Sequence, residues 1–167
     1  MELTPNQEVG QPESDGSEAG MAASFLSGGA LLSAIRGHHV GIHPLADLAR
    51  QFGLMYQRRQ DASATEFHCR RSELMRAVDA WAAEHQTSPH PNATLHTETL
   101  GSVIDQVAEA HVHAYQLLMT INPTDPAVHA AWFRLAELVD SYSDLITKVI
   151  QRSRRLPTSS TQTREHP

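Results

Sequence analysis

The sequence predicts an all-α protein, an up-and-down bundle of about four helices. Apolar residues recur every three or four positions over much of 29–154, which is the spacing of amphipathic helices. We find no stretch of useful length that alternates apolar and polar residues, as a half-buried strand would. Proline-containing turns separate the later apolar stripes. At 167 residues, one domain is the default expectation.

Composition divides the chain into three parts. Residues 1–23 form a predicted disordered acidic tail, because their first 20 residues hold five acids, no Lys or Arg, and many small polar residues. We expect residues 24–156 to form a single helical-bundle domain and the polar residues 157–167 to be a second disordered tail. The formal net charge of −6 comes almost entirely from the first tail. The near-neutral remainder argues against a nucleic-acid partner.

The first predicted helices are separated by a short loop. Residues 29–36 favour a short helix that ends at Gly37, and Pro44 suits the first position of a longer helix over 44–60. This second helix has an apolar stripe at helical spacing. The stripe consists of Leu45, Leu48, Ala49, Phe52, Met55 and Tyr56.

Ser63 and Glu66 form a capping-box pattern, which predicts a new helix over 64–85. The residues before Ser63 include neither Gly nor Pro, however, and the apolar period continues without a change of phase. One continuous helix over 44–85 is therefore an open alternative to two helices.

The last two predicted helices cover residues 97–121 and 126–154. Thr97 is a plausible N-cap for the first, and Asp125 followed by Pro126 is a start signal for the second. Because the turn between them is short, we expect antiparallel neighbours. The predicted apolar face of 97–121 consists of Leu100, Val103, Ile104, Val107, His111, Ala114, Leu118 and Ile121. The cleanest stripe of the chain, on 126–154, includes Leu135, Leu138 and Tyr142.

A polar constellation at the start of helix 97–121 is a candidate catalytic site. His96 would act as acid or base, since histidine titrates near neutral pH, and Glu98 and Asp105 would supply carboxylates. Arg70 or Arg71 would bind an anionic ligand group.

Each of these candidates also has a structural interpretation. The acids lie opposite the apolar stripe and would face water, unless the helix is central and contacted on both sides. Arginine stems can also simply cover apolar surface while their heads reach water.

The 11 histidines do not predict a metal site. The chain lacks the Glu-x-x-His pairs of di-iron bundles, and His111 and His113 point in very different directions on one helix. His111 lies on the apolar face, where a hydrogen-bonded core histidine is expected. Cys69 is the one cysteine, so no disulfide forms within the chain. The sequence indicates no particular cofactor.

No apolar run reaches the roughly 20 residues of a spanning helix, so we expect no membrane partner and a cytoplasmic location. The basic residues are 12 Arg and one Lys, a bias typical of GC-rich bacterial genomes.

Three segments within residues 35–106 resemble the DUF4254 family of bacterial proteins of unknown function, in its actinobacterial type. They read IRGHHVGIHPLADLARQF, RRSELMRAVDAW and LHTETLGSVIDQ. The chain differs at Gln106, where an arginine would be expected by analogy. The resemblance implies no activity. The residues that carry it are Arg71, Asp79, Trp81, His96, Thr97, Glu98, Gly101 and Asp105.

The sequence favours a self-associating or partner-binding module of unknown activity. Long apolar stripes and the lack of a nucleophile with a neighbouring base both point that way. We therefore expect a homo-oligomer or a protein partner. The alternative is a small bacterial metabolic enzyme or ligand-binding protein that uses the polar site at the start of helix 97–121. Whether the protein is an enzyme is left open.

Overall fold

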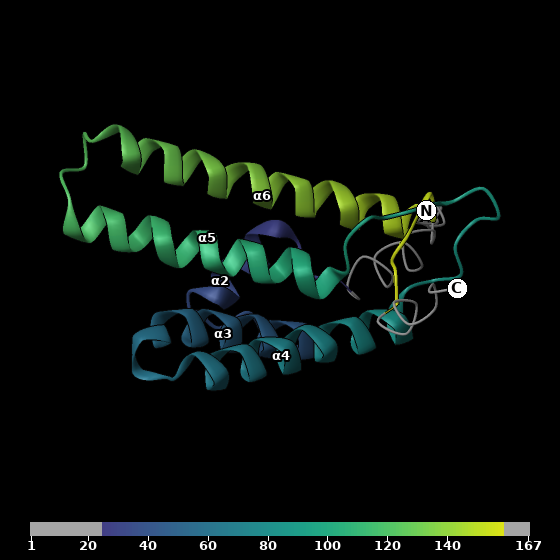
Figure 1. The fold of residues 1–167 in the computed structure, drawn as a ribbon. Helices are drawn as coiled ribbons and strands as arrows, with labels where there is room; N and C mark the ends of the chain where they lie inside the picture. Colours follow the sequence, from purple (N-terminus) through teal and green to yellow (C-terminus); the bar gives the residue numbers. More distant parts are fainter. Residues whose placement is uncertain (1–24, 159–167) are drawn as a thin grey trace, which may run out of the picture.

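The computed structural model describes residues 25–158 and confirms the all-α prediction (Figure 1). The predicted tail over 1–23 lies outside the described residues, and so does the predicted tail over 157–167 apart from residues 157–158. The described helices are α2 (Gly28–Ile35), α3 (Pro44–Gln57), α4 (Ala64–His85), α5 (Leu100–Thr120) and α6 (Pro126–Ile150). A 3-10 turn, η1 (Arg59–Asp61), and two short strands, β1 (Thr94–Leu95) and β2 (Arg154–Arg155), complete the described elements.

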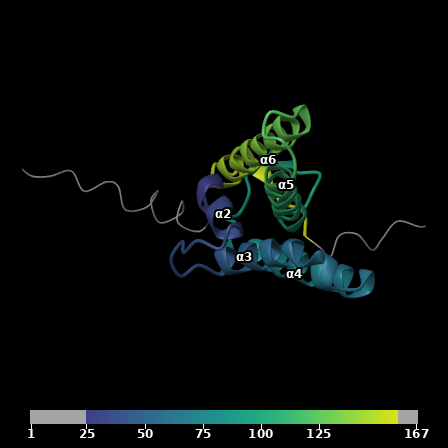
Figure 2. The same ribbon diagram turned by 90° about the vertical axis from the view of Figure 1, so that its left-hand side faces the viewer.

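Two helical hairpins form the bundle. Helices α3 and α4 make one hairpin, α5 and α6 make the other, and α2 lies between them (Figures 1 and 2). Helix α5 contacts each of the other four described helices. It is therefore the central helix, and side chains on more than one of its faces are covered.

The chain between α3 and α4 breaks, so the continuous-helix alternative over 44–85 is wrong. Helix α3 ends at Gln57, earlier than predicted, because residues 59–61 tighten into η1. The predicted capping box then starts α4. The Ser63 hydroxyl accepts from the backbone N of Glu66 at 3.2 Å, and the Glu66 carboxylate accepts from the backbone N of Ser63 at 2.9 Å. These bonds satisfy two helix-end donors and fix the new helix.

Two predicted helix ends also need correction. Helix α5 begins at Leu100, with Thr99 rather than Thr97 as the N-cap, since the Thr99 hydroxyl accepts from the backbone N of Ser102 at 3.1 Å. Helix α6 ends at Ile150 rather than at residue 154. The chain turns at Arg152, which has a φ of 62°, and β2 then pairs in parallel with β1. Pairing between the two strands supplies partners for backbone groups that a longer helix would have used internally.

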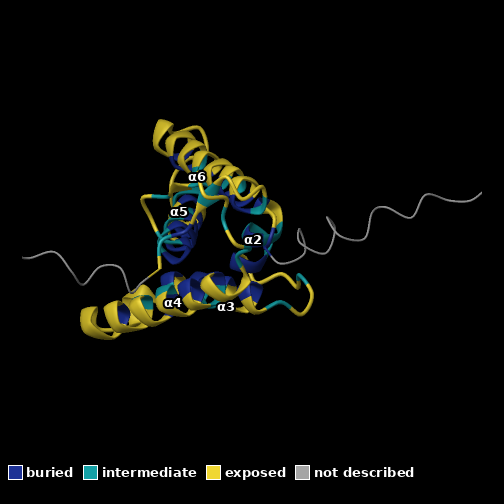
Figure 3. Ribbon diagram, turned by 90° about the vertical axis from the view of Figure 1, so that its right-hand side faces the viewer, coloured by how far each residue is buried: buried dark blue, intermediate teal, exposed yellow. Residues whose placement is uncertain are grey.

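The core lies between the two hairpins, where the buried residues face one another (Figure 3). The stripe predicted for α6 is on the inner side: Leu135 and Tyr142 are buried and Leu138 is half-buried. The Tyr142 hydroxyl, fully buried, donates to the carbonyl of Leu26 at 2.8 Å, as a buried phenol requires. None of the helices within residues 25–158 is long and apolar enough to span a bilayer.

Candidate functional site

A buried carboxylate is the centre of the polar cluster that sequence reasoning proposed. Asp105 lies on α5 with a relative exposure of 0%. Its position would face water on an isolated α5–α6 hairpin, but α3 and α4 also pack against α5. A carboxylate buried this deeply must be paired and hydrogen-bonded, since an isolated buried charge is strongly destabilising.

Arg71 of α4 and Tyr56 of α3 satisfy that carboxylate. The Arg71 Nε lies 3.1 Å from Oδ1 and 3.0 Å from Oδ2, and its Nη2 lies 2.6 Å from Oδ2. The Tyr56 hydroxyl donates to Oδ1 at 2.7 Å. The three residues come from three helices, so the cluster joins α3, α4 and α5 at one point.

The electrostatics of this cluster favour a fixed charge pair. Hydrogen bonds with Asp105 raise the pKa of Arg71 above its ordinary value. Burial, followed by the hydrogen bond to Asp105, raises the pKa of Tyr56. Arg71 therefore stays charged and Tyr56 stays protonated at neutral pH. Charge-assisted hydrogen bonds of this kind hold helices together.

A second buried carboxylate positions the start of α5. Asp79 of α4 accepts from the backbone N of Gly101 at 2.7 Å, where a helix exposes unpaired N–H groups. A Cβ at position 101 would overlap the carbonyl oxygen of Met75, so the close approach of the two helices requires glycine there.

His96 and Glu98 lie in the turn just before α5 and contact each other through the backbone. The His96 Nδ1 is 3.2 Å from the backbone N of Glu98 and 2.9 Å from its carbonyl oxygen. The exposed Glu98 carboxylate accepts from the Gln106 amide at 3.0 Å. Gln106, which stands where an arginine was expected, thus still binds a nearby carboxylate. It binds Glu98, whereas Asp105 is bound by Arg71.

Arg70 points away from this group. Its guanidinium hydrogen-bonds to Gln51 and lies 3.4 Å from the Glu73 carboxylate, over the groove between α3 and α4. Of the five candidate residues, the structure therefore brings Arg71 and Asp105 into direct contact and joins His96 to Glu98. Arg70 belongs to a different surface.

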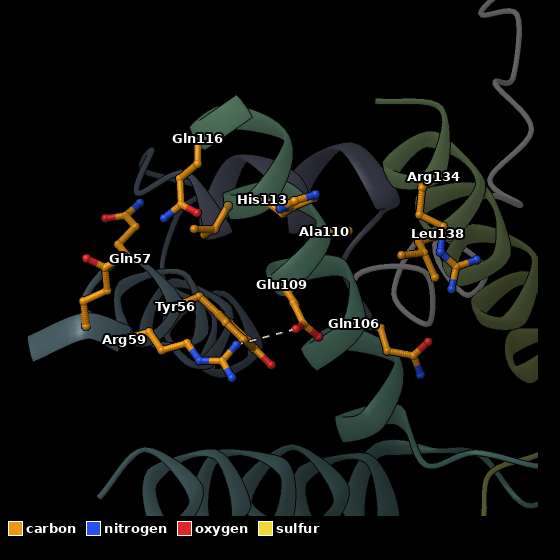
Figure 4. A pocket seen from close by; sticks show the side chains of 12 residues that line it. Tyr56, Gln57, Arg59, Gln106, Glu109, Ala110, His113, Gln116, Arg134 and Leu138 are labelled. Carbon is orange, nitrogen blue, oxygen red and sulfur yellow. Dashed lines mark ion pairs between the residues drawn. The ribbon is translucent and has the colours of Figure 1, made fainter. Parts of the chain in front are cut away.

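A groove of about 580 Å³ runs along α5 between the end of α3 and helix α6 (Figure 4). Tyr56 links it to the buried cluster, since its ring lines the groove and its hydroxyl bonds Asp105. An Arg59–Glu109 ion pair of 3.8 Å crosses the groove, and Arg134 enters it from α6. Both members of that pair are more than half exposed, so the pair adds little stability.

A smaller recess of about 360 Å³ adjoins the groove, and Gln57 and Gln116 line both. Its wall includes His111, which is 4% exposed and whose Nδ1 has no hydrogen-bond partner among residues 25–158. The predicted core position of His111 is thus observed, but the expected hydrogen bond on Nδ1 is not.

Sequence reasoning missed two members of these sites. Tyr56 belongs to an apolar stripe, and nothing in the pattern shows that its hydroxyl reaches a carboxylate on another helix. Arg36 ends α2 beside His111 and is separated from it by 75 positions in the sequence. Only the packing of α2 against α5 brings these two residues together.

Within residues 25–158, no three His, Cys, Asp or Glu side chains gather closely enough to hold a metal ion. The site thus defines an all-α bundle protein whose central helix carries a buried Asp–Arg–Tyr cluster and two adjoining recesses. Residues 33–158 match the family described as protein of unknown function (DUF4254), and the chain belongs to that family. No curated protein and no solved structure matches the chain.

Proposed function

We propose that the protein is a self-associating helical module that pairs with a second copy through the end of its central helix. The single observation behind this proposal is an uncovered stretch of core face on α5. Tyr115 is 42% exposed, Met119 is 80% exposed, and Ile121, just past the helix, is 37% exposed. The α5–α6 turn extends beyond the α3–α4 turn (Figure 1), so the other hairpin does not cover this end.

Helical geometry places these side chains on the core face. Ile104, Ala108 and His111 are buried, and Tyr115 and Met119 follow them at spacings of four residues. Residues at such spacings lie on one side of a helix. The Tyr115 ring has neighbours on several sides: Trp132 of α6 with ring centroids 5.4 Å apart, His111 at 4.8 Å, and the Arg36 guanidinium at 5.8 Å from its centroid. The open apolar surface therefore lies beyond it, at Met119. We call Leu118, Met119 and Ile121 the α5 end patch.

A second copy suits the α5 end patch because the domain has little net charge to oppose association. Residues 25–158 carry 12 Arg or Lys and 13 Asp or Glu. In a two-fold dimer the same patch lies on both sides of the interface, so an apolar patch is its own complement. Burial of a Leu or Met side chain contributes about 1.5–3 kcal/mol.

Sedimentation equilibrium over a range of concentrations tests the proposal. We expect the unmodified chain to dimerise and Met119→Glu to be monomeric, because an exposed position accepts the charge in the monomer but not in an apolar interface. Phe133→Glu is the matched control. Phe133 is also large, apolar and 67% exposed, but it lies on the outer side of α6, away from α5.

The dimer is expected to persist in Phe133→Glu. A monomeric unmodified chain at every concentration would overturn the proposal. A Met119→Glu variant that dimerises as well as the unmodified chain would also overturn it.

Ligand binding at the start of α5 is the second candidate function. A polar groove of about 480 Å³ there is lined by Arg76, Asp79 and Glu98, together with Ser72, Thr97, Thr99 and Ser102. Glu98 is exposed in it, whereas Asp105 is buried under Arg71. This candidate therefore depends on Glu98 rather than on all five residues. A thermal-shift screen of small cations and anions, repeated on Glu98→Gln, tests it; no ligand-dependent shift in the unmodified chain would exclude it.

A further inference from the structure

We infer that the recess beside His111 is a binding site for a small organic carboxylate with an apolar body. The recess lies where the ends of α2 and α3 meet the middle of α5, and all its residues come from one chain. Its volume of about 360 Å³ falls within the range of small-molecule pockets, which starts near 300 Å³. The site does not depend on self-association.

The first observation that points to a ligand is the buried His111 side chain. This side chain is 96% buried, being 4% exposed, and its Nδ1 has no partner among the described residues. Buried polar atoms without a partner are few in native proteins, and each needs an explanation. Burial, together with the nearby Arg36 charge, lowers the pKa of His111 to about 4. At neutral pH the ring is therefore uncharged, with one N–H donor and one acceptor nitrogen.

Arg36 supplies the positive charge that would bind the carboxylate of the ligand. It is exposed at the end of α2, and its guanidinium carbon lies 5.8 Å from the centroid of the Tyr115 ring. No carboxylate within residues 25–158 forms an ion pair with Arg36, although Arg36 is the arginine that lines this recess. A planar guanidinium with free N–H donors matches the two oxygens of a carboxylate.

The other residues that line the recess indicate the chemistry of the remaining part of the ligand. The Tyr115 ring and the buried Val112 provide apolar surface, and the Gln57 and Gln116 amides offer both donors and acceptors. The centroids of the Tyr115 and His111 rings are 4.8 Å apart, so aromatic surface lies next to the His111 ring. A carboxylate on Arg36, with a flat apolar body against Tyr115 and beside the His111 ring, matches the charge and the apolar wall of this recess.

Calorimetric titration with benzoate tests the inference, and benzamide is the neutral probe of the same shape. We expect benzoate to bind and benzamide to bind at least about tenfold more weakly, because a charged hydrogen bond is lost. Arg36→Gln should weaken benzoate binding by a similar factor. Benzoate should also shift the imidazole ¹⁵N signals of His111, and a titration without such a shift would contradict the site.

Arg134→Gln is the matched control, because Arg134 is also an exposed arginine but lines the adjoining groove. It should leave benzoate affinity unchanged. The inference is overturned if benzoate fails to bind, if benzamide binds as well, or if Arg134→Gln rather than Arg36→Gln abolishes binding. Met119→Glu should bind benzoate like the unmodified chain, which separates this site from the proposed dimer.

Discussion

Two buried polar side chains on α5 differ in whether their hydrogen-bonding atoms have partners. Asp105 receives hydrogen bonds from Arg71 and Tyr56, while His111, six positions later, keeps an Nδ1 atom that no described residue satisfies. Both side chains are at least 96% buried. The comparison teaches that burial alone does not mark a functional residue. A satisfied buried carboxylate holds helices together, whereas an unsatisfied ring beside a free guanidinium is suited to a ligand.

The largest expected effect comes from removing the partner of the satisfied group. Arg71→Met leaves the Asp105 carboxylate buried with only Tyr56 to bind it, and we expect a loss of about 3–5 kcal/mol in the free energy of unfolding. Because the Arg71 side chain is 37% exposed, the lower end of that range applies. Urea denaturation at neutral pH measures the change.

Arg76→Met is the control for that variant, since Arg76 is an exposed arginine on the same helix. It should change the free energy of unfolding by no more than about 0.5 kcal/mol. The double variant Arg71→Met, Asp105→Leu should be more stable than Arg71→Met alone, because no unpaired buried charge remains. Equal losses for Arg71→Met and Arg76→Met would mean that the pair does not hold the helices.

A smaller effect is expected when the second donor to Asp105 is removed. Tyr56→Phe keeps the ring in the core and deletes one hydrogen bond to a charged acceptor, so we expect a loss of about 1.5–3 kcal/mol. Tyr115→Phe, on an exposed tyrosine, is the control for loss of a phenol group. Urea unfolding curves with unchanged slopes would show that stability alone has changed. Identical curves for the two variants would argue against the hydrogen bond.

The buried His111 ring predicts that the free energy of unfolding depends on pH. The pKa of His111 is about 4 in the fold and near 6.5 when unfolded, so protonation favours the unfolded chain. The contribution of the neutral His111 ring to the free energy of unfolding is intact above pH 6.5 and is lost as the pH falls toward 4. Between pH 7 and pH 5 we expect a loss of about 2 kcal/mol in the free energy of unfolding. The lowered carboxyl pKa values of Asp47 and Glu66 act below this window.

Urea unfolding of the His111→Leu variant at both pH values isolates this contribution. Leucine fills a similar volume without a titrating ring, so the variant should lose about 2 kcal/mol less than the unmodified chain. His113→Gln is the control, because His113 is exposed on the other side of α5. An unchanged pH dependence in His111→Leu would show that the His111 ring is not held in its neutral form.

Helical periodicity predicted most of this fold but little of its candidate sites. The period shows which face of a segment is apolar, and the core positions Leu135 and Tyr142 follow from it directly. It does not show whether a second face is also covered. Asp105 lies on such a second face of α5, and its burial depends on where the α3–α4 hairpin packs.

The partners of the two buried groups were harder to predict for the same reason. Arg71 was one of the predicted ligand-binding residues, but Tyr56 fits an apolar stripe and gives no sign of its hydrogen bond. His111 was expected to be a satisfied core histidine. Its lack of an Nδ1 partner depends on how α2, α3 and α5 approach one another, which no local pattern records.

The pairing of β2 with β1 bears on where this domain can be shortened. A boundary at Ile150, where the last helix finishes, would remove the carbonyl of Ser153, which accepts from the backbone N of Thr94 at 3.2 Å, and that of Arg155, which accepts from the backbone N of His96 at 2.8 Å. It would also remove Leu156, which is 4% exposed. The final turn and strand therefore hold the loop that leads into α5, and we expect a chain that ends at Ile150 to be less stable than one that extends through Leu156.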